Sequence, residues 1–180
     1  DDTVLVPNLF FDTWYDYGAR ETLMMANQFK RSAKSDAAKQ QSLIIGPGTH
    51  CNFAQSADQL SVGERPMSNA HLDFEQIQVD WYNYWLKGDR SVNIARPFLT
   101  YYLMGADTYK TADQWPLKNT QRTPWYLTDN GQLLTQAPAT GSHNQFTYDP
   151  ANPVPSLGGH SCCTGSDSEA GGYDQRSNEA

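Results

Sequence analysis

Two short stretches of the chain carry the residue types of an acid–base pair. Asp16 follows an apolar run at residues 4–11, and His50 follows a shorter run at residues 43–45, in the sequence LIIGPGTHCN. An imidazole can take the proton of a weak nucleophile, and a carboxylate on its other nitrogen fixes the tautomer. The two stretches therefore predict acid–base chemistry. Judged by residue type alone, Asp12 is as good an acid as Asp16, and a single histidine in a loop is more often only solvated.

The segments around these residues predict a strand, a helix and a second strand. Residues 4–11 and 43–45 are apolar enough for buried strands, and residues 21–29 are rich in helix formers. The Gly-Pro-Gly after residue 45 predicts a loop. About forty residues in this order suit a parallel strand–helix–strand unit. Such units present their reactive groups at the carboxyl ends of the strands, which is where Asp12, Asp16 and His50 are expected.

A second helix is predicted in the sequence DFEQIQVDWYNYWLKG. Its apolar residues recur three and four positions apart, and Gly88 can cap its C-terminus. We interpret this stripe as core packing, with an aromatic ligand site as the alternative. The stripe consists of Phe74, Ile77, Trp81, Tyr84 and Trp85.

The pattern changes after residue 92, so we place a domain boundary between residues 1–92 and 93–180. Short aromatic and β-branched runs separated by Asn-Gly, Asp-Pro and Pro-rich turns predict an all-β sandwich or jelly roll. The sequence WYLTDNGQLLT predicts a hairpin with Asn130 and Gly131 at the turn. From residue 155 onward Gly, Ser and Cys predominate, which predicts a long loop.

Composition excludes several classes of function. A net charge of −7 without a basic cluster argues against a nucleic-acid partner, and no apolar run is long enough to span a membrane. The three cysteines and four histidines show no metal-ligand spacing, so we expect neither a metal nor a cofactor. The chain carries no signal that indicates its compartment.

Five motifs in order resemble the cocaine-esterase and X-Pro dipeptidyl-peptidase family of serine hydrolases. They are TWYDYGARETL, LIIGPGTHCN, VDWYNYWLKG, YYLMGADTYKTADQWP and YDPANPVPSLGG. The resemblance implies an α/β fold followed by a β fold: the C-terminal strands and helices of an α/β-hydrolase domain, then the first part of a jelly roll. It also implies that Asp16 is the acid and His50 the base of a Ser-His-Asp triad. Trp14 and Tyr15 are candidates for a substrate pocket, although core packing is the favoured interpretation for both.

The chain departs from the family pattern at the nucleophile and beside the histidine. It has no Gly-x-Ser-x-Gly, the motif that presents the serine and helps to form the oxyanion hole. Ser161 and Cys51 are poor substitutes, because Ser161 follows His50 in the chain and adjacent residues such as His50 and Cys51 point apart. The family usually has Trp where this chain has Gly48, and losing that ring is expected to loosen the wall beside His50.

Two hypotheses about function follow. The first is a fragment of a serine hydrolase that acts on a small ester or a peptide, carrying the acid and the base but not the nucleophile. The alternative is a non-catalytic jelly-roll module that binds a ligand or partner, with an inert hydrolase remnant. In either case we expect the first half to dock on the rest of the hydrolase or on another chain. Without that partner, six apolar side chains should be left exposed: Val4, Leu5, Leu9, Leu43, Ile44 and Ile45.

Overall fold

The computed structural model describes residues 3–50, 52, 58–128, 130–139, 141, 143, 145–160 and 169–178. The described residues form two compact units. One contains residues 1–117 and 156–180, and the other contains residues 118–155. The boundary that the sequence predicts between residues 92 and 93 lies inside the first unit, and as a family boundary it stays a prediction. Among the described residues, no helix has both the length and the hydrophobicity needed to cross a membrane.

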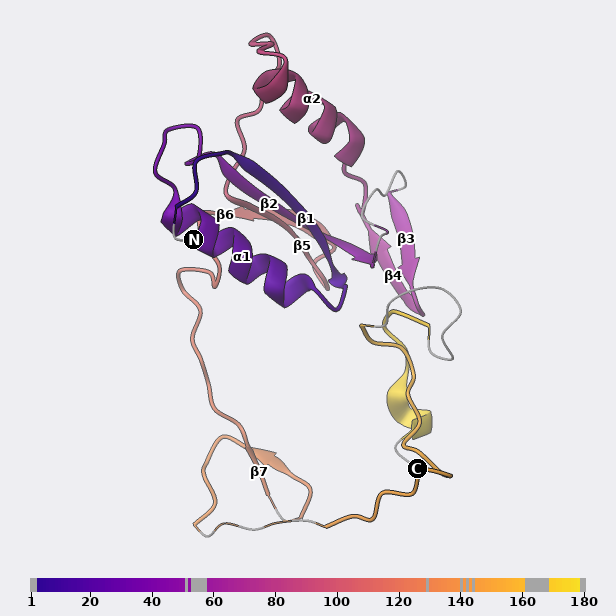
Figure 1. Cartoon of the computed structure of the whole chain (residues 1–180). Helices are drawn as coiled ribbons and strands as arrows, with labels where there is room; N and C mark the ends of the chain where they lie inside the picture. The colour runs from indigo at the N-terminus through magenta and orange to yellow at the C-terminus, as the bar shows by residue number, and fades with distance from the viewer. Residues whose placement is uncertain are drawn as a thin grey trace. The chain divides into compact units, whose positions relative to one another are not determined.

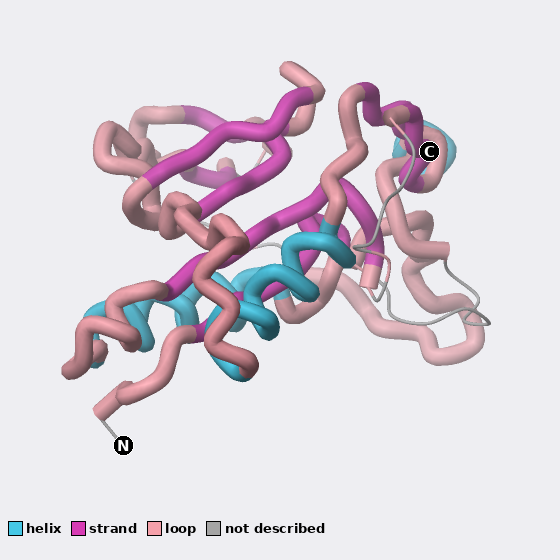
Figure 2. The backbone as a smooth tube through the Cα atoms, turned by 90° about the horizontal axis from the view of Figure 1, so that it is seen from above, coloured by secondary structure: helices cyan, strands magenta, loops and turns pink. Residues whose placement is uncertain are grey.

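A mixed four-stranded sheet with the order β1-β2-β5-β6 organises the first unit (Figure 1). Strands β1 (Asn8–Tyr15), β2 (Gln41–Thr49) and β5 (Leu99–Leu103) are parallel, and β6 (Thr108–Ala112) pairs with β5 in the antiparallel direction. Helix α1 (Ala19–Ser32) connects β1 to β2 and runs alongside the strands (Figure 2). The predicted strand–helix–strand unit is therefore present, and its predicted helix at residues 21–29 lies within α1.

The two faces of the sheet pack against different helices. Leu43 and Ile45 of β2 belong to a core with Leu23 and Ala26 of α1. Ile44, between them, packs on the opposite face in a core formed with α2 (Phe74–Leu86). Neighbouring side chains of a strand point to opposite faces, so three consecutive apolar residues serve two cores.

Because both helices belong to this chain, the prediction that the central strand would be left exposed is wrong. Leu43, Ile44 and Ile45 are fully buried, and Val4 is 9% exposed. Only Leu5, at 62% exposure, is bare as expected, and Leu9 is partly buried.

Two strand boundaries differ from the sequence prediction. Strand β1 begins at Asn8 rather than at residue 4, because Val4 only forms an isolated bridge with Ala33 and the ladder with β2 starts at Asn8. Strand β2 continues through Gly46, Pro47 and Gly48, where a loop was predicted. The register shifts between Thr13 and Tyr15 of β1, so β2 carries one extra residue there. Such a bulge accommodates a proline inside a sheet, because the ladder is already interrupted.

Helix α2 begins and ends as its sequence predicts. The Asp73 side chain accepts a hydrogen bond from the Gln76 N–H at 3.0 Å, which caps the N-terminus. Gly88 has a φ of 73°, which lets the chain turn back after the helix. Phe74, Ile77 and Trp81 are buried, so the core interpretation holds for these members of the stripe.

Strands β3 (Gln59–Val62) and β4 (Arg65–Ser68) form a hairpin that packs on the sheet. Val62 and Met67 of the hairpin form a core with Ala70 and Tyr102 of β5. The Gly-rich end of the chain, predicted as a loop, bridges to this hairpin through Gly63 and Gly172. A short 3₁₀ helix follows at Gln175–Asn178.

The second unit contains the predicted hairpin. Strands β7 (Tyr126–Leu127) and β8 (Leu133–Leu134) are antiparallel, and Gly131 has a φ of 74° in the connecting loop. The Gly131 N–H donates to the Thr128 carbonyl at 3.1 Å, which closes the turn. The hairpin prediction is confirmed, whereas the described residues show no complete jelly roll.

The two-sided burial of β2 gives a test of the fold. We expect Ile44→Ala to lower the free energy of unfolding by about 2–5 kcal/mol, because it opens a cavity against Phe74 and Ile77. The measurement is urea unfolding followed by circular dichroism. Leu5→Ala is the control and should change stability by less than about 0.5 kcal/mol. An equal loss of stability in the two variants would contradict the packing of the sheet between α1 and α2.

Candidate active site

Asp16 is held in a tight turn between β1 and α1. Its backbone N–H donates to the Thr13 carbonyl at 3.1 Å, and its carbonyl accepts from Ala19 at 3.3 Å. One carboxylate oxygen, Oδ1, accepts the Gly18 N–H at 2.7 Å. The side chain is 13% exposed. The turn therefore fixes one oxygen of Asp16 and leaves the other for a second partner.

That second partner is His50. The His50 Nδ1 lies 2.6 Å from the Asp16 Oδ2, and the His50 side chain is 27% exposed. Tyr15 and Thr49, the residues just before them, are partners across β1 and β2, so the two side chains leave the sheet at neighbouring points. Among the described residues, His50 Nε2 has no hydrogen-bond partner. The predicted contact is present, while the catalytic roles of both residues stay predictions.

The structure adds Tyr17 to the site. Its ring centroid lies 4.9 Å from that of His50, at an interplanar angle of 38°. Tyr17 is 59% exposed, so it covers part of the imidazole from the solvent side. The only signal in the sequence was its position directly after Asp16, and sequence reasoning missed it.

Asp12, the alternative acid, lies deeper in the same strand. It is 7% exposed, and its Oδ1 accepts the Thr13 N–H at 2.8 Å. Burial raises the pKa of the Asp12 carboxyl, and the nearby Asp16 charge raises it further. Among the described contacts it is Asp16, not Asp12, that meets the histidine.

Trp14 and Tyr15 point to opposite faces of β1. The Trp14 Nε1–H donates to the Tyr102 carbonyl at 2.6 Å, and its ring packs 5.7 Å from that of Trp115. Tyr15 packs against the core of the β3–β4 hairpin, with its ring 6.1 Å from that of His160. These contacts are those of packed side chains, and the pocket role suggested for both residues stays a prediction.

Gly48 lies directly under the turn that follows His50. A Cβ atom at Gly48 would lie 2.2 Å from the Asn52 carbonyl oxygen. That turn is closed by the Asn52 N–H, which donates to the Thr49 carbonyl at 3.0 Å. The backbone of the turn therefore occupies the space beside Gly48, where the family resemblance led us to expect a missing ring.

The candidate thiol and serine nucleophiles, Cys51 and Ser161, lie outside the described residues, as do Cys162 and Cys163. Within the described part of the chain, no group of three or more His, Cys, Asp or Glu side chains could hold a metal ion.

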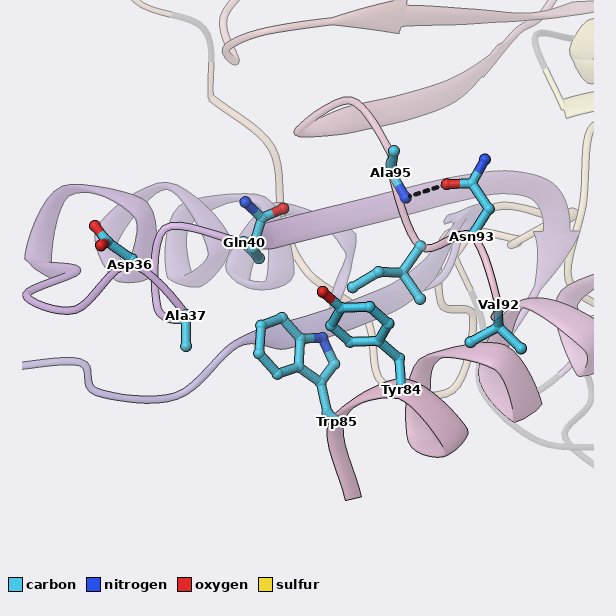
Figure 3. Close-up of a pocket in the computed structure, with 9 residues that line it drawn as sticks. Asp36, Ala37, Gln40, Tyr84, Trp85, Val92, Asn93 and Ala95 are labelled. Atoms are coloured by element: carbon cyan, nitrogen blue, oxygen red, sulfur yellow. Dashed lines mark hydrogen bonds between the residues drawn. The ribbon is translucent and has the colours of Figure 1, made fainter. Parts of the chain in front are cut away.

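A cavity of about 450 Å³ lies elsewhere on the first unit (Figure 3). It is lined by residues that precede β2, by the end of α2 and by the segment that precedes β5, so it lies at the amino ends of the parallel strands. Asp16 and His50 follow the carboxyl ends. Tyr84 and Trp85 form its aromatic wall, and the Trp85 Nε1 is buried without a partner among the described residues. This cavity is separate from the candidate site.

The fold and the site define an α/β protein with a carboxylate–histidine pair at the carboxyl edge of its parallel strands. Residues 92–179 match the family described as the X-Pro dipeptidyl-peptidase C-terminal non-catalytic domain. The chain is also 31% identical over 165 residues to the cocaine esterase of Rhodococcus sp. (strain MB1 Bresler), covering 85% of this chain and 27% of that protein. These two matches confirm the resemblance seen in the sequence to a C-terminal portion of the cocaine-esterase and X-Pro dipeptidyl-peptidase family.

A solved structure shares the fold. The aminopeptidase from the marine sediment archaeon Thaumarchaeota archaeon superposes with a TM-score of 0.65 at 21% sequence identity, over 84% of this chain and 24% of that protein. The chain therefore spans about a quarter of the length of these two proteins.

The contact between Gly48 and the histidine turn can be tested. We expect Gly48→Ala to displace the turn and break the Asp16–His50 hydrogen bond, because the clash is with backbone and no side chain can yield. The measurement is the low-field proton NMR signal of the His50 Nδ1–H. Gly46→Ala, on the same strand, is the control, since a Cβ there would lie 3.4 Å from Phe74, an ordinary contact. If Gly48→Ala kept the signal as Gly46→Ala does, the turn would not depend on Gly48.

Proposed function

We propose that this chain is part of a serine hydrolase that cleaves small esters, or amides such as X-Pro peptides. The observation that carries the proposal is the 2.6 Å contact between His50 Nδ1 and Asp16 Oδ2. In a Ser-His-acid triad this contact holds the imidazole in the tautomer whose Nε2 can accept the serine proton. In α/β-hydrolases the acid precedes the histidine in the chain, as Asp16 precedes His50.

The proposed fold is the end of an α/β-hydrolase domain, residues 1–92, followed by the start of a jelly roll, residues 93–180. Parallel strands covered by a helix on each face support the first part. The family match over residues 92–179 supports the second. Strands β5 and β6 of the second part continue the sheet of the first, so we propose that the two parts share this sheet.

We propose that the serine and the oxyanion hole come from a part of the enzyme outside this chain. No Gly-x-Ser-x-Gly occurs in the 180 residues. Strand β1 is an edge strand, with β2 on one side and no strand pairing on the other among the described residues. Edge strands leave a row of backbone groups unpaired, and Leu5 and Val6 beside this edge are exposed. The rest of the hydrolase would pair here.

In the proposed mechanism His50 moves one proton. Its Nε2 takes the proton of the serine hydroxyl as the oxygen attacks the ester or amide carbonyl. The same nitrogen returns the proton to the leaving alcohol or amine. Asp16 stays ionised and accepts the Nδ1–H throughout, which stabilises the imidazolium. Tyr17 shields one face of the ring from water. The names of the two similar proteins, an esterase and an aminopeptidase, support esters and peptides as the substrate classes.

The alternative is a non-catalytic module that binds a ligand or partner. Its support is the description of the family matched by residues 92–179 as non-catalytic, together with the missing nucleophile motif. On this alternative the Asp16–His50 contact would be a structural remnant.

Substitutions in the full-length enzyme separate the two proposals. We expect Asp16→Asn to lower kcat/KM for an aryl ester by about 10⁴-fold, because an amide favours the wrong imidazole tautomer. His50→Ala should cost at least as much, and the double variant little more than the worse single variant. Asp12→Asn is the control and should be far milder. A silent Asp16→Asn, with circular dichroism unchanged, would refute the catalytic proposal.

The 180-residue chain alone should be inactive. We expect it to hydrolyse p-nitrophenyl acetate no faster than imidazole at the same concentration, because it lacks both the nucleophile and the oxyanion donors. The measurement is initial rate, with a fluorophosphonate probe to detect any reactive serine. Labelling of Ser161 would show that the nucleophile lies within this chain after all.

A further inference from the structure

Asp12 is a buried carboxyl group beside the candidate site that the proposed mechanism does not use. It lies two residues from Phe10 and from Trp14, which pack in the core under α1, so by the alternation of the strand it faces the same side. Its side chain is 7% exposed, and its Oδ1 accepts the Thr13 N–H at 2.8 Å. The Thr22 side chain gives a second hydrogen bond, so Asp12 is a buried carboxyl group held by hydrogen bonds from Thr13 and Thr22.

The Asp12 carboxyl faces Asp16 across the start of α1. A Cβ atom built on Gly18 would lie 3.2 Å from the Asp16 Oδ1 and 4.0 Å from the Asp12 Oδ2, so both carboxyl groups border this glycine. The side chains of Asp16 and Thr22 are both hydrogen-bond partners of Asp12. The charged residues in the first turn of α1, Arg20 and Glu21, pair with each other at the surface at 3.2 Å. Within the described residues, therefore, no cation is paired with Asp12.

Two carboxylates this close, with one of them buried, cannot both be ionised without a large electrostatic cost. Asp16 accepts the Gly18 N–H through Oδ1 and meets His50 through Oδ2. Burial raises the pKa of the Asp12 carboxyl and Asp16 adds to the shift, and together they outweigh the hydrogen bonds from Thr22 and Thr13, which lower it. A protonated carboxyl is a hydrogen-bond donor, and the acceptor in front of Asp12 is Asp16.

We propose that Asp12 is a positioning residue whose protonated carboxyl group donates a hydrogen bond to the Asp16 carboxylate and fixes its orientation toward His50. The inference rests on the proposed function and assigns Asp12 a role in the same site. With Gly18 holding Oδ1 and Asp12 holding the carboxylate from the strand side, the Oδ2 atom stays directed at His50 Nδ1.

The experiment compares Asp12→Asn with Asp12→Ala in the full-length enzyme. The amide of Asn still donates to Asp16, so we expect kcat for an aryl ester within about threefold of the parent enzyme. Ala cannot donate, and we expect kcat to fall about 10- to 100-fold with KM unchanged, as for other small misplacements of a catalytic group. In an Asp16→Asn background Asp12→Ala should cause no further loss, because Asp12 acts through Asp16. Asp36→Ala, an exposed carboxylate at the other end of the strands, is the control for a general effect of lost charge.

Equal activity of the two Asp12 variants, or an equal loss from Asp12→Ala in both backgrounds, would overturn the inference. If Asp12→Ala does not fold, carbon-13 NMR titration of the parent protein tests the inference instead. We expect the chemical shift of the Asp12 carboxyl carbon to report a protonated group at the pH of the activity assay, and an ionised Asp12 at that pH would overturn the inference. A silent Asp16→Asn would instead refute the proposed function, whatever Asp12 does.

Discussion

The pairing register of β1 with β2 determines whether the candidate site exists. Tyr15 and Thr49 are partners, so the residues after them leave the sheet side by side, which puts Asp16 and His50 within hydrogen-bond distance. A slip of one residue would move one side chain about 3.3 Å along the strand and turn it to the other face. The acid–base pair is thus a consequence of strand register more than of any local loop conformation.

The register in turn depends on the bulge in β2. Between the pairs Thr13–Gly46 and Tyr15–Thr49, β2 advances three residues while β1 advances two. Without the extra residue Tyr15 would face Gly48, and His50 would lie one position too far along. The Pro-Gly part of the Gly-Pro-Gly sequence suits this place for two reasons. Pro47 has no N–H to leave unpaired, and Gly48 makes room for the turn after His50.

Features of the fold that depend on neighbouring residues could be predicted from the sequence. Features that depend on residues far away in the chain could not. Helix α2 was predictable from its stripe and its capping residues, because these signals act within a few positions. The extension of β2 through Gly-Pro-Gly was missed, because turn-forming residues predict a loop unless a partner strand requires a bulge. Asp16 and His50 could be named because motifs marked them, whereas Tyr17 was missed because its contact lies across the sheet edge.

Asp16 links the start of α1 to the proposed catalytic pair. Helix α1 begins at Ala19, its N-cap residue Gly18 has no side chain to cap it, and the Gly18 N–H donates to the Asp16 Oδ1. The same carboxylate contacts His50 through Oδ2. One side chain therefore accepts a backbone N–H at the start of α1 and also contacts the imidazole ring. The partial positive charge at the helix N-terminus attracts a carboxylate, which helps to hold the acid beside the start of α1. Because α1 packs on Leu43 and Ile45 of β2, the strand that carries His50, the helix and the histidine are anchored to the same strand. A shift of α1 along the sheet would therefore carry the acid away from the base without breaking either strand.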